Sequence, residues 1–309
     1  MAMDWNKLRG LAASGRIANL PSVAGNVFAG IAVAAVHVNR LADCFFWQSI
    51  IILVAAATCL YLAGNFLNDR VDLEWDTIHR PERALPSGLF TARLYTGLAW
   101  VFGLAGLVLS ALIGLKCALV SVMILCLVGI YTYWHKKSAW SVIAMGMCRA
   151  LLPLLGFYAI HDELKWIWPM AVGLFCYIVG LSMSARYEGI KNAPRRMKYA
   201  SRILFCTAAI VMVLGTNGMM SAGYLMVYGV LPYAVWLILC VTVFGKTVSS
   251  HVSNLLAGIP LLDWMVLLPL GLGMERVLTA GNFLSIACLF FPPLAFLGGK
   301  LLQRFAPAS

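Results

Sequence analysis

The chain has 309 residues, of which 62% are hydrophobic and only 11% are charged, and its mean hydropathy is +0.87. These values exceed what the core of a water-soluble protein needs and are typical of integral membrane proteins. Nucleic-acid binding is set aside, because the formal charge of +11 has no soluble basic domain on which to lie.

Ten apolar stretches follow one another along the chain, each able to cross a hydrocarbon layer of about 30 Å as a helix of about 20 residues. They begin near residues 18, 47, 92, 115, 140, 166, 203, 222, 253 and 281. Between residues 203 and 245 the division rests on one break, Gly215-Thr-Asn-Gly218. We therefore predict a single all-α membrane domain over residues 1–309, with nine or ten transmembrane helices.

Lys and Arg are distributed unevenly between the two sides that these spans define. With both termini on one side, eighteen of them fall on that side and four on the other, namely Arg40, Lys116, Lys165 and Arg276. Because cytoplasmic loops carry the excess of Lys and Arg, we expect the termini and the polar loops described below to face the cytoplasm. The sequence predicts a multi-pass protein of a bacterial inner membrane.

A run of acids follows the second span, and it holds four of the chain's twelve carboxylates within residues 69–76. On a helix, residues four positions apart differ by only about 40° around the axis, so Asn68, Asp72 and Asp76 share one face. Asp69 lies next to this face, one position after Asn68. Mg²⁺ prefers oxygen ligands and is usually held by one or two carboxylates together with phosphate oxygens. We predict that Asn68, Asp69, Asp72 and Asp76 bind Mg²⁺ and form half of a diphosphate site.

Two arginines flank Pro81 directly after the acids. Pro81 should end the helix near His79, and the planar guanidinium groups of Arg80 and Arg83 match phosphate geometry. The alternative is a solvated loop held by salt bridges, as most charge runs are. The phosphate site is favoured because the acids and the ordered Arg-Pro-x-Arg run directly follow about twenty apolar residues.

Arg149 is the one charge that we expect inside a span. Intramembrane charges usually face a bundle interior or a watery cavity, because exposure to lipid costs several kcal/mol. Arg149 is therefore a candidate for a polar cavity. The alternative is a helix that begins later, with Arg149 reaching the membrane interface.

Cysteine and histidine give no sign of a metal site. The nine cysteines include no Cys-x-x-Cys and are expected to be core residues. Of the five histidines only His79 lies near the acids. The other four are expected to be interface residues: His37, His135, His161 and His251.

A second polar stretch, residues 182–196, follows the sixth span. Four helices separate it from the acids, so both emerge on the same face and are expected to converge over one cavity. Its only carboxylate is Glu188, which lies near the cations Arg186 and Lys191. Glu188 therefore forms either a local ion pair or a metal or acceptor contact.

The chain resembles the UbiA superfamily of intramembrane prenyltransferases. The resemblance rests on the spacing N-D-x-x-D-x-x-x-D from Asn68 to Asp76 and on the run from Arg80 to Gly88. Weaker support comes from Asn19 to Asn26, Tyr131 to Lys137 and Arg149 to Gly156. Superfamily members commonly have nine helices around a central cavity.

The resemblance implies Mg²⁺-dependent transfer of an isoprenyl group from an allylic isoprenyl diphosphate to a small hydroxylated or aromatic acceptor within the bilayer. It implies catalytic roles for Asp69, Asp72, Asp76 and Glu188. It implies that the substrates are bound by Asn26, Arg80, Arg83, Tyr133, Lys136, Arg149, Arg186, Tyr187 and Lys191. Candidates to line the site and stabilise cationic charge through their ring faces, or simply to pack, are Tyr61, Phe66, Tyr131 and Tyr133.

The second acidic motif departs from the superfamily. Typical members carry D-x-x-x-D after the sixth helix, where this chain offers only Glu188. Either Arg186 and Lys191 replace a second metal electrostatically, or the chain binds a prenyl lipid without turning it over. The altered motif resembles that of a divergent, EboC-like branch found in some bacteria.

Two other functions use the same features. A secondary transporter or lipid carrier would place its site near the bilayer midplane, whereas the acids lie at a membrane edge, which favours the enzyme. A membrane terpene cyclase would use the same donor and attack with the substrate's own double bond, and the motifs fit it as well as they fit transfer.

Overall fold

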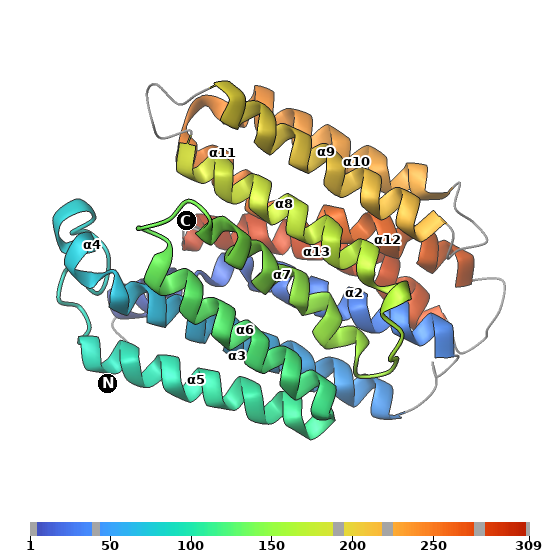
Figure 1. Cartoon of the computed structure of the whole chain (residues 1–309), viewed down its shortest axis with the longest axis horizontal. Helices are drawn as coiled ribbons and strands as arrows, with labels where there is room; N and C mark the ends of the chain where they lie inside the picture. The colour runs from blue at the N-terminus through green and yellow to red at the C-terminus, as the bar shows by residue number, and fades with distance from the viewer. Residues whose placement is uncertain (1–4, 39–43, 188–194, 218–224, 275–281, 307–309) are drawn as a thin grey trace.

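The computed structural model describes residues 5–38, 44–187, 195–217, 225–274 and 282–306, and these residues form a bundle of helices that run nearly parallel to one another (Figure 1). The helices are α1 (Trp5–Ser14), α2 (Leu20–Val38), α3 (Cys44–Val71), α4 (Leu73–His79), α5 (Ala92–Ile113), α6 (Leu115–Trp134), α7 (Ser141–Phe157), α8 (Trp168–Tyr187), α9 (Arg195–Asn217), α10 (Met226–Thr242), α11 (Val248–Ala257), α12 (Ile259–Met274) and α13 (Asn282–Phe305). Short 3₁₀ turns are η1 (Ile17–Asn19), η2 (Leu164–Trp166) and η4 (Phe244–Lys246).

The all-α membrane class predicted from the sequence is confirmed. Within the described residues, eight helices are long and apolar enough to cross a membrane, counting α11 and α12 as one span. The helices α7 and α10 are shorter apolar helices at the fifth and eighth predicted spans. The helix α9 ends at Asn217, inside the predicted break.

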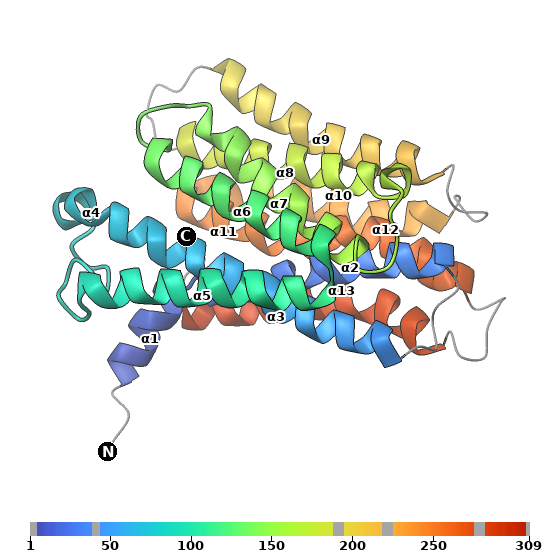
Figure 2. The same cartoon turned by 60° about the horizontal axis from the view of Figure 1, so that its bottom comes forward.

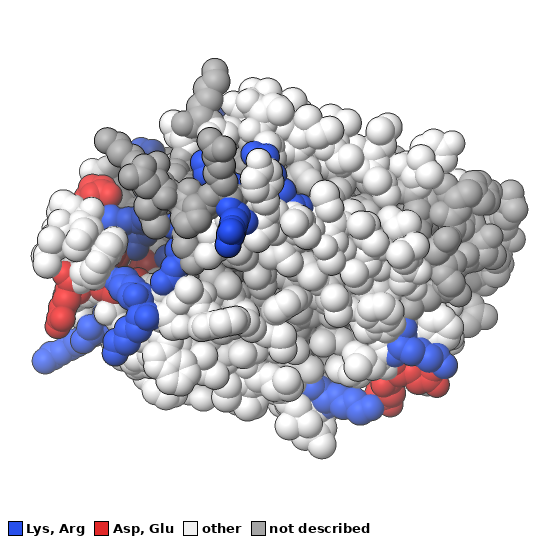
Figure 3. Space-filling model, turned by 45° about the horizontal axis from the view of Figure 1, so that its top comes forward, with Lys and Arg blue, Asp and Glu red and all other residues white. Residues whose placement is uncertain are grey.

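Charged residues gather at the two ends of the bundle. The short helix α4 and the C-terminal end of α13 lie at one end of the bundle, and α1 projects from the same end (Figure 2). Lys and Arg gather toward this end on the face shown in Figure 3, and a smaller group of both charge signs lies at the other end. Ion pairs at that other end join Lys116 to Asp162 and Lys165 to Glu163, at 2.7 and 2.5 Å.

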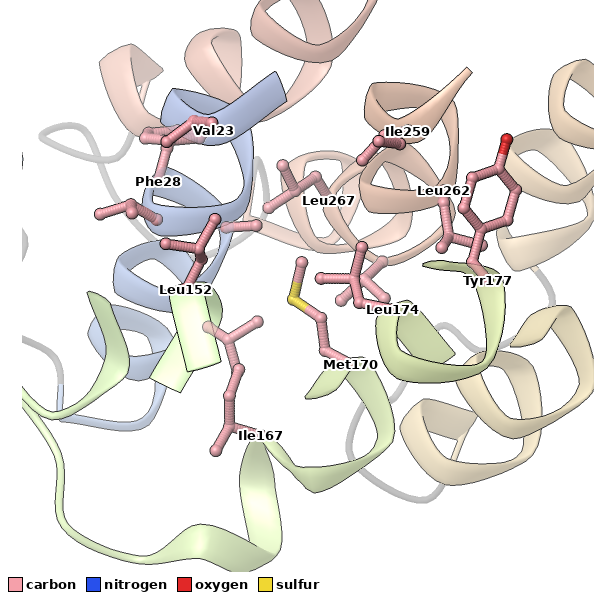
Figure 4. Close-up of a cluster of buried hydrophobic side chains, with 14 of the residues drawn as sticks. Val23, Phe28, Leu152, Ile167, Met170, Leu174, Tyr177, Ile259, Leu262 and Leu267 are labelled. Carbon is pink, nitrogen blue, oxygen red and sulfur yellow. The ribbon is translucent and has the colours of Figure 1, made fainter. Parts of the chain in front are cut away.

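The core of the bundle lies among α2, α7, α8 and α12 (Figure 4). Leu174 and Leu262 are fully buried there, and the hydroxyl of Tyr177 donates to the carbonyl of Leu255 at 2.7 Å. Dispersion contacts and internal hydrogen bonds of this kind hold membrane bundles together, because lipid is as apolar as the side chains.

Two glycines allow α2 and α7 to pack closely. A Cβ at Gly30 would collide with the carbonyl oxygen of Pro153, and a Cβ at Gly156 would collide with that of Val27. Small residues at such positions let helix backbones approach each other. The close approach sets the register of α7 against α2, and it therefore sets the position of Arg149.

The loop from α4 to α5 returns the chain to the membrane. Gly88 has a φ of 77°, a conformation that L side chains rarely adopt. The side chain of Thr91 then caps α5 by accepting from the Leu94 N–H at 3.3 Å. The turn brings Leu85 into a small buried cluster with Phe66 and Tyr95.

Candidate functional site

The acids lie where α3 gives way to α4. The Asp72 N–H donates to the Asn68 carbonyl at 2.9 Å, and the Asp76 N–H donates to the Asp72 carbonyl at 2.8 Å. The helical hydrogen-bond spacing thus continues through the junction, and Asn68, Asp72 and Asp76 follow one another on successive turns. All three and Asp69 are at most 9% exposed. The helix α4 ends at His79, where Pro81 was predicted to stop it.

One guanidinium bridges two of these carboxylates. Arg83 Nη1 lies 2.7 Å from Asp76 Oδ2 and 3.9 Å from Asp69 Oδ1. The return of the chain after Pro81 places Arg83 over the acids that precede it. In this structure Arg83 pairs with the chain's own carboxylates, and its predicted contact with a diphosphate stays a prediction.

Arg16 is a second cation on Asp69. Its Nη2 lies 3.2 Å from Asp69 Oδ1, and its Nη1 donates to Asn65 Oδ1 at 2.5 Å. Its backbone is left-handed, with φ 47° and ψ 48°, and it is the one non-glycine residue with positive φ among those described. That conformation costs about 1–2 kcal/mol and aims the side chain of Arg16 at Asp69. Burial alone would lower the pKa of Arg16, but Asp69 acts together with Tyr61, Tyr131 and Asp72 to raise this pKa above its ordinary value.

Asp72 is held by the two residues that directly follow α6. Lys136 Nζ lies 2.6 Å from Asp72 Oδ1, and His135 Nε2 lies 3.2 Å from Asp72 Oδ2. Burial would raise the pKa of Asp72, but the hydrogen bonds and the charges of His135 and Lys136 together outweigh it and hold this pKa below its ordinary value. The Lys136 ammonium also lies 4.4 Å from the ring centroid of Trp75.

Arg186 braces the segment that carries this cation. Its Nη1 donates to the carbonyls of His135 and Ser138, at 3.0 and 3.1 Å, and lies 3.4 Å from the Ser141 hydroxyl. These contacts fix the turn between α6 and α7. Arg186 therefore positions Lys136, and its predicted contact with substrate stays a prediction.

The donor set at the α3–α4 junction fits Mg²⁺ together with a phosphate ligand. Asn68 donates to Asp72 Oδ2 at 3.2 Å, while Asn68 Oδ1 is buried without a hydrogen-bond partner. No group of three His, Cys, Asp or Glu side chains within the described residues is arranged to hold a metal alone. One or two carboxylates, an amide oxygen and phosphate oxygens form the set that Mg²⁺ usually accepts.

A second polar cluster lies deep in the bundle. Asn26 Nδ2 donates to both carboxylate oxygens of Asp263, at 2.8 and 2.7 Å, and Arg149 Nη2 donates to the Ser22 hydroxyl. The expectation that Arg149 is the one charge inside a span was wrong, because Asp263 is fully buried in the span Ser249–Gly273. Arg149 itself is only 8% exposed, which favours the interior position over the interfacial one.

Other predicted residues do not join the acids. The side chain of Arg80 is exposed and forms no hydrogen bond or ion pair within the described part of the chain, and Tyr133 is 62% exposed. Glu188 and Lys191 lie outside the described residues, as does the side chain of Tyr187.

The aromatic candidates separate into packing and polar roles. Phe66 belongs to the small buried cluster beside α5. Tyr61 accepts a hydrogen bond from Asn19 Nδ2 at 2.9 Å. Tyr131 stacks on His135 with ring centroids 5.1 Å apart. His135 directly precedes Lys136 in the sequence, so Tyr131 packs beside the segment that contacts Asp72.

Sequence reasoning missed three residues of these clusters: Arg16, His135 and Asp263. The expectation that only His79 lies near the acids was wrong, because His135 contacts Asp72 whereas His79 is exposed and stacks on Trp75. Asp263 had a readable signal, since a carboxylate within an apolar span marks function by default. Arg16 gave no such signal, because a basic residue next to the first span is already explained by the excess of Lys and Arg in cytoplasmic loops.

Comparisons with known proteins match this chain to one family and to several of its curated relatives. The model of the UbiA prenyltransferase family matches residues 23–256. A protoheme IX farnesyltransferase of Thermosynechococcus vestitus is 30% identical over 127 residues, or 38% of this chain and 39% of that protein. A digeranylgeranylglyceryl phosphate synthase of Methanothermobacter thermautotrophicus is 33% identical over 117 residues, or 31% of this chain and 40% of that protein. The matches thus span about two fifths of these relatives.

Solved structures share the fold over nearly the whole chain. A digeranylgeranylglyceryl phosphate synthase structure has a TM-score of 0.55 at 19% identity and covers 96% of this chain and 99% of its own. A UbiA homologue from Archaeoglobus fulgidus, bound to GPP and Mg²⁺, has a TM-score of 0.53 at 14% identity with the same coverage. The family match extends over most of the chain and includes the acidic junction, so the chain belongs to the UbiA prenyltransferase family.

Proposed function

We propose that this protein transfers an isoprenyl group from an allylic isoprenyl diphosphate to a small hydroxylated or aromatic acceptor, with Mg²⁺. The observation that carries the proposal is the buried junction of α3 and α4. There Asn68, Asp69, Asp72 and Asp76 meet Arg16, Arg83 and Lys136 at a membrane edge. Oxygen ligands for a hard cation and cations for phosphate oxygens occur side by side.

The ion pairs at the junction suit an exchange of partners. Asp69, Asp72 and Asp76 are each paired with a cation of the chain itself. A diphosphate that enters with Mg²⁺ brings both signs of charge. The carboxylates of Asp72 and Asp76 can then turn to the metal, while the cations released from them bind phosphate oxygens.

Asn68 Oδ1 and the carboxylates of Asp72 and Asp76 would hold Mg²⁺, which when bound stabilises negative charge on a departing diphosphate. Lys136 and Arg83 bind the phosphate oxygens, and their effect is strong because the junction is buried. The allylic C–O bond breaks with its electron pair on the diphosphate. The acceptor then bonds to the allylic carbon and loses a proton.

The apolar helices below the junction supply the rest of the site. An isoprenyl tail placed among them leaves water, at a gain of about 0.8 kcal/mol for each buried CH₂. The same surroundings keep water from the allylic cation. We place the junction on the cytoplasmic side of a bacterial inner membrane, because the excess of Lys and Arg lies at this end.

The test is to incubate the purified protein with a series of allylic diphosphates and Mg²⁺, with and without acceptors, and to detect pyrophosphate and lipid products. Asp72→Asn and Asp76→Asn should abolish Mg²⁺-dependent release of pyrophosphate. Glu74→Gln is the matched control, because Glu74 is an exposed acid on the same short helix. Release by both variants at the wild-type rate would defeat the assignment.

The same assay separates the alternatives. A cyclase would release pyrophosphate and form a lipid product without any acceptor, and a carrier would bind the diphosphate without releasing pyrophosphate. If one Mg²⁺ suffices, Glu188→Gln should cost much less activity than Asp72→Asn. Equal losses would indicate a second metal site at the stretch after α8.

A further inference from the structure

Arg16 is held in a strained conformation, although it does not belong to the set of metal-binding side chains. It lies in the turn between α1 and η1 with φ 47° and ψ 48°, and it is the one non-glycine residue with positive φ among those described. Such strain persists only where the surrounding structure enforces it, and it is concentrated at ligand-binding and catalytic sites. The conformation therefore points to a function for the side chain that it aims.

Two side chains of α3 hold the guanidinium group of Arg16. Its Nη1 donates to Asn65 Oδ1 at 2.5 Å, and its Nη2 donates to Asp69 Oδ1 at 3.2 Å. Asn65 Nδ2 donates in turn to the Gly15 carbonyl at 2.9 Å, so one amide fixes both the side chain and the turn. Two of the five N–H groups of Arg16 are used in this way, and the other three form no hydrogen bond within the described residues. Its side chain is 22% exposed, so these donors are open to an anion that enters from solvent.

Arg16 binds deeper in the bundle than the other cations of the junction. The helix α3 runs toward the end of the bundle that carries α4, so Asn65 lies roughly 10 Å deeper than Asp72 along the helix axis (Figure 1). Lys136 contacts Asp72, and Arg83 pairs most closely with an acid one turn further out. The three cations thus follow one another from the inner side of the junction to its outer side.

Aromatic and acidic side chains surround the guanidinium group of Arg16. It interacts electrostatically with Tyr61, Tyr131 and Asp72. Tyr61 belongs to α3 and lies roughly 16 Å deeper than Asp72 along the helix axis. Aromatic ring faces stabilise cationic charge, such as that of an allylic group that loses its diphosphate. Arg16 therefore lies between the metal-binding acids and an aromatic side chain at the depth where an isoprenyl chain would begin.

The donor can enter such a site in one orientation. Its diphosphate needs the metal and the cations of the junction, whereas its isoprenyl chain is apolar and is driven from water into the bundle. The phosphate that carries the chain is therefore the inner one, at the depth of Arg16, and the terminal phosphate is the outer one, near Lys136 and Arg83. When the allylic C–O bond breaks, its electron pair stays on the ester oxygen of the inner phosphate. A preorganised guanidinium group in a buried site stabilises charge that develops in this way.

We propose that Arg16 binds the phosphate group that carries the isoprenyl chain and stabilises the negative charge that this phosphate gains as the C–O bond breaks. Asn65 and Asp69 position the guanidinium group for this contact, and Lys136 and Arg83 bind the terminal phosphate. The proposal rests on the proposed prenyl transfer and deepens it by adding a catalytic residue.

The left-handed backbone at Arg16 offers variants that separate the side chain from the turn. Arg16→Gly removes the guanidinium group and relieves the strain, because glycine adopts positive φ readily, whereas Arg16→Ala removes the group and keeps the strain. Arg16→Lys keeps the charge without the planar fork. Arg70→Gln is the control, because Arg70 is an exposed arginine on α3 directly after Asp69.

Binding to the full-length protein is measured with Mg²⁺ and two unreactive probes. One probe is geranyl thiolodiphosphate, and the other is geranyl thiolomonophosphate, which lacks the terminal phosphate. Arg16→Gly and Arg16→Ala should each weaken the binding of both probes by about tenfold or more, because both probes carry the inner phosphate. Arg83→Gln should weaken only the diphosphate probe to this extent. Arg70→Gln should leave both affinities within about twofold of the wild type.

Three further measurements separate the contact from a defect in folding. Arg16→Gly should unfold at a Tm equal to or above that of Arg16→Ala, and millimolar guanidinium ion should restore part of its affinity for both probes. The affinities of Arg16→Lys should lie between those of the wild type and of Arg16→Gly. With a reactive donor, kcat of Arg16→Gly should fall as well as its affinity, because the guanidinium group acts most strongly on the charge of the transition state. An unchanged kcat would refute this action.

Wild-type affinity of Arg16→Gly for both probes would overturn the proposal, because Arg16 would then serve only to shape the turn. A loss confined to the diphosphate probe would overturn it too, since Arg16 would then bind the terminal phosphate, and so would failure of the wild type to bind either probe. Release of pyrophosphate by the wild type tests the proposed function separately. Probe binding that depends on Arg16 without any such release would retain the phosphate contact and reject the transferase.

Discussion

Lys136 and Asp72 form a direct ion pair, with Lys136 Nζ 2.6 Å from Asp72 Oδ1, and this pair joins the end of α6 to the junction of α3 and α4. The two residues come from different hairpins of the bundle. The pair therefore depends on how α6 packs against α3, and it makes the diphosphate site a property of the tertiary structure.

Replacement of Lys136 by Met should weaken donor binding. A hydrogen bond to a charged group contributes about 1.5–3 kcal/mol, so the KM for the allylic diphosphate should rise by about tenfold or more. Lys137→Met is the control, because Lys137 is the adjacent lysine and its side chain forms no ion pair within the described residues. Steady-state kinetics at saturating Mg²⁺ measures the effect, and equal KM values for the two variants would contradict this role of Lys136.

Arg83 and Arg80 should behave differently although both flank Pro81. Arg83 contacts two buried carboxylates, so Arg83→Ala should lower the free energy of unfolding by about 1.5–3 kcal/mol and reduce activity. Arg80→Ala should stay within about 0.5 kcal/mol, because Arg80 is exposed and unpaired within the described residues. Unfolding in a mild detergent measures both, and a larger loss for Arg80→Ala would refute the assignment.

The close packing of α2 and α7 should tolerate no side chain at Gly156. A methyl group there collides with the backbone of Val27, so Gly156→Ala should destabilise the protein by about 1–3 kcal/mol. Gly129→Ala is the matched control on α6, because nothing lies within 4 Å of a Cβ at that position. Thermal unfolding measures the difference in stability between the two variants, and Gly156→Ala should have the lower Tm. Similar Tm values would show that the contact between α2 and α7 can relax.

The stability of the junction should fall in acid because of Asp72. Its pKa in the folded protein lies below the ordinary 3.8, so its stabilising contribution is fully present above about pH 4. That contribution is lost as the pH falls through the lower folded-state value. The stability difference between the wild type and Lys136→Met should shrink over this range, and a difference that grows with acid would have the wrong sign.

Local features of the sequence predicted much of the fold and one half of the site. Long apolar stretches predicted the spans, because a chain in lipid must satisfy its backbone within helices. The spacing of Asn68, Asp72 and Asp76 predicted successive turns, and Pro81 predicted the end at His79. Each of these inferences depends only on residues near one another in the chain.

The partners of those residues were decided by the tertiary structure. Asn26 and Asp263 are 237 positions apart, and His135 reaches Asp72 rather than an interface. Such contacts depend on the rotation and register of one helix against another, which small residues such as Gly30 and Gly156 set. Hydropathy and spacing fixed which residues lie at the junction and in the spans, because these are local properties. The pairs that the charged side chains form depend on how the helices pack. Several rotations of a helix can bury the same apolar surface, so hydropathy alone does not decide these pairs.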